Sequence, residues 1–220
     1  MKPQICYIIC AIQRSGTKLL CEALRNTGLA GVPDEYFLCN KEVHWEAGYL
    51  RSVFQQGSTS NGVFGATIMW NYFPYVVRNL QELLGCKEVA AAELMRAVFD
   101  DPRYIWLVRR DKVRQAVSWA RAAQTEVWCV RQAESTAPKR EPVFDFTFVD
   151  NLHRLVLEGE AGWQSFFEES GVQPLKIVYE ELVEAYEATA LRILKHLGIR
   201  EKDVVFGKRE LRRQADAVNE

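Results

Sequence analysis

The segment with the clearest chemical potential lies between an apolar run and a helical pattern, and it reads Gln13, Arg14, Ser15, Gly16 and Thr17, followed by Lys18. Glycine permits a tight turn, and consecutive backbone N–H groups at the start of a helix form a binding site for anions. The neighbouring side chains add two positive charges and hydroxyl groups around the same point. This pattern predicts a loop that binds a phosphate or a similar anion.

The segment does not match the phosphate loop of nucleoside triphosphatases, G-x-x-x-x-G-K-[ST]. Ala11 stands where the first glycine of that motif belongs, and Gly16 is followed by threonine and then lysine, the reverse order. No apolar strand ends in a convincing magnesium-binding aspartate. A kinase or triphosphatase of related architecture is therefore the weaker hypothesis, and magnesium-dependent ATP turnover would support it.

A second anion-binding pattern combines Arg110 with Ser118, eight residues later. The arginine follows the apolar run 104–108, and the serine falls about two turns into the helix predicted next. An arginine fork together with a hydroxyl group suits a second phosphate. The spacing alone is common, so its value depends on the elements around it.

Those elements alternate between short apolar runs and helical patterns. We predict strands at residues 5–11, 63–70, 104–108 and 175–178, and helices at residues 17–27, 75–84, 89–99, 112–124, 145–170 and 182–197. This order is typical of an α/β fold with a mainly parallel sheet. Such sheets bind ligands at the carboxyl ends of their strands, where both anion-binding patterns lie.

Length and composition agree with this fold. A chain of 220 residues with 48% hydrophobic and 26% charged residues fits one domain, and we expect residues 1–220 to form it. The 28 basic and 29 acidic side chains argue against a non-specific nucleic-acid binder. No segment has the roughly 18 apolar residues of a membrane span.

The six cysteines show neither CxxC nor metal-ligand spacing. We expect them to be small buried side chains in a reducing compartment, without a structural metal. Together with the absence of an apparent signal peptide, this predicts a cytoplasmic protein.

Longer sequence words resemble the bacterial trehalose 2-sulfotransferase family of the sulfotransferases that use 3′-phosphoadenosine 5′-phosphosulfate (PAPS). These words are QRSGTKLLCEAL, TGLAGVPDEYF, VFGATIMW, RRDKVRQAVSWARAAQTEVW, VYEEL and RQADA, in collinear order over most of the chain. The resemblance implies a P-loop-like central parallel sheet flanked by helices, PAPS as sulfuryl donor with PAP as product, and a homodimer. It also implies transfer to a hydroxyl group of a carbohydrate or glycolipid, with no metal.

The resemblance assigns roles to individual residues. Arg14, Ser15, Gly16 and Thr17 correspond to the loop that holds the 5′-phosphosulfate, and Arg110 and Ser118 to the clamp for the 3′-phosphate. Tyr179 and Glu180 lie where such enzymes approach the adenine, and Arg213 and Gln214 match a late segment on the nucleotide side.

Glu35, in the word Pro-Asp-Glu-Tyr-Phe, matches the proposed general base of the family. Many sulfotransferases use histidine instead, so His44 is the second candidate, and the adjacent Trp45 is a candidate for the acceptor pocket. Local sequence leaves the choice between Glu35 and His44 open.

Two departures from the family pattern bear on activity. Lys18 stands where a small or hydroxyl residue is expected, so it either adds a charge to the donor site or points away. Thr67 stands where relatives tend to carry lysine. Thr67 and the short segment after residue 217 leave open the alternative that the protein is a non-catalytic homologue that binds a nucleotide.

Overall fold

The computed structural model describes residues 2–38, 40, 42–129, 141–200 and 204–211. Its centre is a parallel sheet of β1 (Ile5–Ala11), β2 (Val63–Met69), β3 (Arg103–Val108) and β4 (Leu175–Val178). The strand order is β2-β1-β3-β4, and every pairing is parallel. These strands confirm the predicted α/β fold, and the bounds of β1 and β4 are the predicted ones.

The apolar runs of β1, β2 and β3 are buried on both faces, as expected where helices cover a parallel sheet, whereas β4 at the edge buries only Ile177. Side chains of β1 alternate between two cores. Tyr7 and Ile9 face one core, whereas Ile8 and Cys10 face the other. Gly65, paired with Tyr7 across the strands, leaves room for the tyrosine ring, whose hydroxyl donates to Ala30 O at 2.6 Å.

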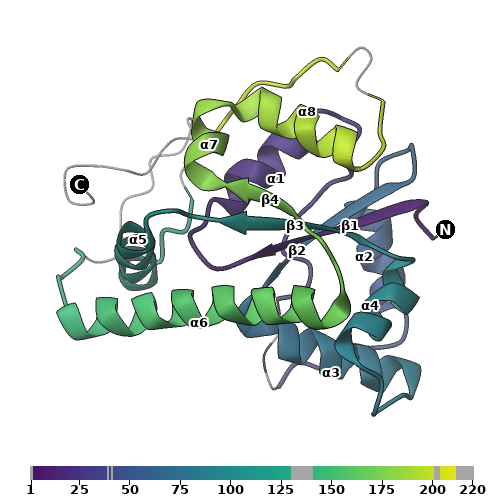
Figure 1. Cartoon of the computed structure of the whole chain (residues 1–220), viewed down its shortest axis with the longest axis horizontal. Coiled ribbons are helices and arrows are strands. Elements are labelled where there is room, and N and C mark those ends of the chain that lie inside the picture. The colour runs from purple at the N-terminus through teal and green to yellow at the C-terminus, as the bar shows by residue number, and fades with distance from the viewer. Residues whose placement is uncertain (1, 39, 41, 130–140, 201–203, 212–220) are drawn as a thin grey trace.

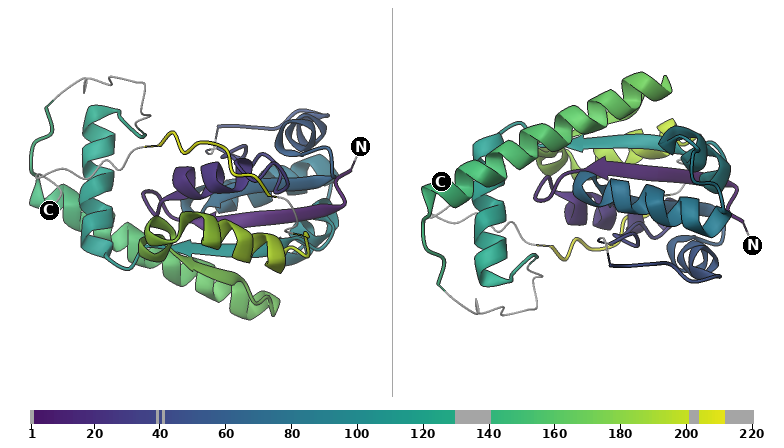
Figure 2. Two further views of the ribbon diagram at one scale, coloured as in Figure 1. Left: turned by 90° about the horizontal axis from the view of Figure 1, so that it is seen from above. Right: turned by 90° about the horizontal axis from the view of Figure 1, so that it is seen from below.

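Helices cover the two faces of this sheet (Figure 1). One face packs against α1 (Thr17–Arg25), α7 (Tyr179–Glu184) and α8 (Tyr186–His196). The other packs against α2 (Tyr49–Gly57), α3 (Phe73–Leu84), α4 (Ala91–Phe99) and α6 (Phe146–Ser170). Figure 2 shows α5 (Lys112–Thr125) lying crosswise at the end of the sheet, beside the start of α6. Among the described helices, none is long and apolar enough to traverse a bilayer.

Two helical features differ from the prediction. The single helix expected at residues 182–197 is two helices, because Ala185 leaves the helical region with φ −126° and ψ 56° and α7 already begins at Tyr179. The segment 49–57, for which no helix was predicted, forms α2 and buries only Val53 and Gly57. Neither a glycine nor a proline marks the break at Ala185, so residue types alone did not reveal it.

The sheet topology puts a switch point, the usual position of a ligand-binding crevice, at the carboxyl end of β1. The chain passes from β1 to β2 on one side and then to β3 on the other, so the strand order reverses beside β1. Open parallel sheets bind ligands at such a switch point. Trp163 fixes α6 near this edge: its buried indole N–H donates to Ala11 O, in the last residue of β1, at 3.0 Å.

Candidate functional site

Three segments lie together at the carboxyl edge of the sheet. The loop after β1 supplies Arg14, the loop after β3 supplies Arg109, and α7, which begins directly after β4, supplies Tyr179. The carbonyl of Arg14 accepts from the guanidinium of Arg109 at 3.4 Å, and this guanidinium lies 4.8 Å from the centre of the Tyr179 ring. The structure therefore brings together residues that are 95 and 70 positions apart in the chain.

The loop after β1 turns tightly at the start of α1. Arg14 and Gly16 both have positive φ, 64° and 98°, and α1 begins immediately at Thr17. The amide of Gln115 in α5 supports the loop by donating to Gln13 O at 2.8 Å. A left-handed residue next to a helix N-terminus directs N–H groups into a concave surface that favours an anion.

Tyr179 closes over this loop. A Cβ atom at Gly16 would lie 3.0 Å from Cε2 of the Tyr179 ring and closer still to Cδ2. The ring thus packs directly on the glycine backbone while the guanidinium of Arg109 stacks against it. Glycine is required at position 16 both for its positive φ and for this close approach.

Two positive charges share the crevice. Burial lowers the pKa of Arg14, and the neighbouring charge of Arg109 lowers it further. Burial also lowers the pKa of Arg109. Within the described part of the chain, the Nε of Arg109 and the Oγ of Ser15 are buried and have no hydrogen-bond partner. A bound anion would relieve the repulsion and satisfy such donors, so these residues fit a phosphate or phosphosulfate group.

Arg110 and Ser118, the second anion-binding pattern, have different partners in the structure. The hydroxyl of Ser118 accepts from Arg14 Nε at 3.0 Å, which joins the two predicted patterns across 104 residues. The guanidinium of Arg110 instead pairs with Glu181 Oε1 at 3.2 Å, and its side chain is 66% exposed. Because an exposed ion pair of this kind is worth about 1 kcal/mol or less, a phosphate could replace Glu181 at little cost.

Glu180 binds the backbone of the turn between β3 and α5. Its carboxylate accepts the backbone N–H groups of Arg110 and Asp111 at 3.0 to 3.3 Å. The Asp111 side chain in turn caps α5 by accepting from Arg114 N at 2.8 Å. This chain of contacts fixes the turn between β3 and α5, and therefore the start of the helix that carries Ser118.

Glu35 lies close to the first loop, on a segment that runs beside β2. The backbone N–H of Thr67 donates to Asp34 O at 2.9 Å, and Asp34 forms a parallel bridge with Ala66. Lys18 reaches this segment from the first turn of α1, and its ammonium lies 3.3 Å from Glu35 Oε1. The candidate base thus lies one side chain away from the anion-binding loop.

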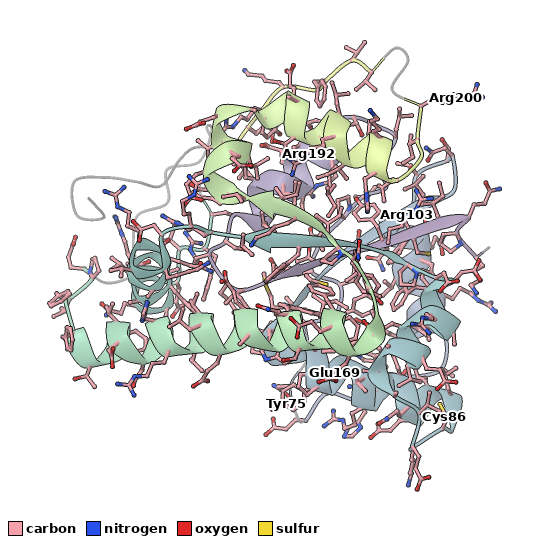
Figure 3. All side chains as sticks on the ribbon, viewed as in Figure 1. Tyr75, Cys86, Arg103, Glu169, Arg192 and Arg200 are labelled. Carbon is pink, nitrogen blue, oxygen red and sulfur yellow. The ribbon has the colours of Figure 1, made fainter. Side chains whose placement is uncertain are left out.

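His44 lies elsewhere. Its exposed ring pairs with Glu82 at 2.9 Å, in the last turn of α3. Figure 3 shows α3 running from Tyr75 towards Cys86, away from α5 and the carboxyl edge of the sheet. At 1.5 Å per residue, Glu82 is about 14 Å along α3 from its first residue. The structure therefore brings Glu35, but not His44, to the anion-binding loop.

The other site residues predicted from the sequence do not line the anion-binding loop in the described part of the structure. Trp45 is 8% exposed and stacks on Tyr49 in the core, rather than lining an open pocket. Thr67 is buried, with its hydroxyl 3.3 Å from Cys21 Sγ. Arg213 and Gln214 lie outside the described residues.

Sequence reasoning missed Arg109, although it selected the next residue. The available signal was position: Arg109 is the first residue after β3, the strand adjacent to β1, so it lies at the switch point. Gln115 was also missed. Its amide supports the loop from inside the protein, and no residue spacing indicates such a contact.

Comparisons with known proteins agree with this geometry. The Stf0 sulphotransferase family model matches residues 6–52 and 40–220. The chain is 30% identical over 249 residues to the trehalose 2-sulfotransferase of Mycolicibacterium smegmatis, covering 96% of this chain and 90% of that protein. It is 29% identical over 227 residues to that of Mycobacterium tuberculosis, covering 87% and 84%. The chain therefore belongs to the Stf0 sulphotransferase family and is a sulfotransferase.

Proposed function

We propose that this sulfotransferase transfers the sulfuryl group of PAPS to a hydroxyl group of a carbohydrate or glycolipid. The observation that carries the proposal is the pair of arginines, Arg14 and Arg109, at the loop after β1, with the carboxylate of Glu35 beside that loop. Two curated relatives are named trehalose 2-sulfotransferases, so trehalose is the first acceptor to test.

The donor side of the site would use the predicted residues together with Arg109. The backbone N–H groups of Gly16 and Thr17, the hydroxyl of Ser15 and the side chain of Arg14 would hold the 5′-phosphosulfate. When bound, the donor supplies a sulfuryl group activated by its bond to phosphate. Arg110 would exchange Glu181 for the 3′-phosphate, with Ser118 completing the clamp.

The adjacent charges suit the chemistry of sulfuryl transfer. Glu35 would accept the proton of the acceptor hydroxyl, whose oxygen then bonds to sulfur while the sulfur–oxygen bond to phosphate breaks. Negative charge grows on the departing phosphate. Arg14 and Arg109 would stabilise that charge, because guanidinium groups in a partly buried site interact strongly with an anion.

The test measures transfer of radiolabelled sulfate from PAPS to trehalose and to a panel of other sugars. Glu35→Gln should lower the rate constant by about a hundredfold or more, as expected for loss of a general base, while PAP binding is retained. Glu46→Gln changes an exposed carboxylate in the same connecting segment and serves as the matched control. Full activity in Glu35→Gln would refute the assignment of the base, and His44→Ala would then be tested.

A homodimer and a cytoplasmic location stay predictions from the sequence and its resemblance. Size measurement in solution tests the first of them directly.

A further inference from the structure

Lys18 contacts the candidate base rather than the anion-binding crevice. Its ammonium lies 2.7 Å from Asp34 Oδ1 and 3.3 Å from Glu35 Oε1. Lys18 is in the first turn of α1, so it connects the helix that begins at the loop to the segment that carries the carboxylates. In the folded chain the charge of this lysine faces the two acidic side chains.

The contacts form an ordered chain that ends at Glu35. Asp34 is fixed to the sheet by the bond between its carbonyl and Thr67 N–H, and its Oδ1 accepts the N–H of Glu35 at 2.8 Å. Lys18 is held by Asp34 and in turn contacts the Glu35 carboxylate. The side chain of Glu35 is 18% exposed, so a fixed cation matters more to it than to a fully hydrated carboxylate.

Lys18 and Asp34 stabilise each other's charged forms. Burial lowers the pKa of Lys18, but the carboxylates of Glu35 and Asp34 outweigh it, so the pKa lies above its usual value. For Asp34, burial raises the pKa, and the bonds from Lys18 and the Glu35 N–H outweigh that effect, so the pKa lies below its usual value. Lys18 thus stays charged at neutral pH.

Resting on the proposed function, we infer that Lys18 is a positioning residue for proton transfer: it holds the Glu35 carboxylate oriented beside the donor loop. The proton passes from the acceptor hydroxyl to Glu35, the acceptor oxygen bonds to sulfur, and the bond between sulfur and the leaving phosphate breaks. Lys18 neither gains nor loses a proton. Asp34 keeps the ammonium in place when Glu35 becomes neutral.

Other charged and titratable groups also bear on this region. Arg25, from α1, lies 3.7 Å from Asp34 Oδ2, and the charges of Arg14 and Glu35 interact. The Tyr36 hydroxyl and the Cys21 thiol are the nearby weak acids, and burial raises the pKa of both. Each therefore stays neutral at neutral pH and adds no charge beside the Lys18 ammonium.

The experiment compares Lys18→Met and Lys18→Arg with the native enzyme in sulfuryl transfer and in PAP binding. Lys18→Met should leave the affinity for PAP unchanged and lower kcat by about tenfold to a hundredfold, the effect of a misplacement of roughly 1 Å. Lys18→Arg should restore most of the rate, because it keeps the cation. Arg25→Met removes a contact to Asp34 but none to Glu35, so it serves as the matched control.

The split between kcat and KM provides a readout that a purely structural role would not change. In Lys18→Met the KM for PAPS should stay at the native value while kcat falls, because the ammonium contacts the carboxylates of Asp34 and Glu35. Rescue of kcat by Lys18→Arg shows that the missing group is a cation. Native kcat in Lys18→Met would overturn the inference, as would loss of PAP binding, which would place Lys18 on the donor side.

The failure of the inference can be distinguished from failure of the proposed function. If Glu35→Gln abolishes transfer but Lys18→Met does not change kcat, only the role of Lys18 is wrong. If Glu35→Gln remains active, the assignment of the base fails and the inference fails with it. If the native protein transfers no sulfate from PAPS, the proposed function fails.

Discussion

The packing of Tyr179 on Gly16 makes a sharp prediction about Gly16→Ala. The new methyl group meets two separate penalties. Gly16 has φ 98°, and the left-handed backbone costs an L-residue about 1–2 kcal/mol. The Cβ atom also enters the space of the Tyr179 ring, and overpacking of this kind costs about 1–3 kcal/mol. The expected loss in the free energy of unfolding is therefore about 2–5 kcal/mol.

Urea unfolding of four proteins separates the two penalties: the native chain, Gly16→Ala, Tyr179→Ala and the double variant. In the Tyr179→Ala background, Gly16→Ala should cost only the backbone part, about 1–2 kcal/mol. Gly28→Ala is the matched control, because Gly28 has φ 66° and a Cβ atom there has no neighbour within 4 Å. If Gly16→Ala costs no more than Gly28→Ala, or the same in both backgrounds, the reasoning about Tyr179 is refuted.

Two further predictions concern charge. Arg109→Met should weaken PAP binding by about tenfold to a hundredfold in calorimetry, the worth of a hydrogen bond to a charged group; Arg103→Met, at the amino end of β3 (Figure 3), should not. Equal effects would remove Arg109 from the site. Because the folded pKa of Asp34 is lowered, its stabilisation is complete above the unfolded value of about 3.9 and is lost as pH falls through the folded pKa. Asp34→Asn should therefore reduce stability at pH about 6, by about 1 kcal/mol or less, and have no such effect at pH about 2. An equal loss in urea unfolding at both pH values would contradict this.

The sheet could be predicted from the sequence because β1, β2 and β3 are apolar on both faces, and β4 is a short run of mostly apolar residues. β1 and β4 have the expected bounds, and the predicted helices at residues 75–84 and 112–124 correspond to α3 and α5 with small differences at their ends. The helix α2 escaped prediction because it buries little apolar surface and lies in a long connection between α1 and β2. The spacing of its apolar residues is therefore a weak signal for a helix.

The candidate site was predictable only in part, because its decisive contacts join distant segments. Position relative to a strand end indicated Arg14 and Gly16. The bond between Arg14 and Ser118 and the ion pair between Lys18 and Glu35 depend on how helices pack on the sheet, which residue spacing does not encode.

The prediction that the cysteines are small buried side chains was also partly correct. Cys6, Cys10 and Cys21 are buried thiols, whereas Cys86 and Cys129 are half-buried. Cys39 lies outside the described residues. Burial raises the pKa of Cys6 and Cys21 to about 11, so both thiols are protonated at neutral pH and behave as packing residues.

The most direct test of the central claim is calorimetric titration of the protein with PAP, in parallel with AMP and magnesium-ATP. We expect PAP to bind much more tightly than AMP, and we expect Arg110→Ala to remove this preference if Arg110 binds the 3′-phosphate as proposed. Equal affinity for PAP and AMP, or a preference for magnesium-ATP, would contradict the assignment of the crevice as a PAPS site.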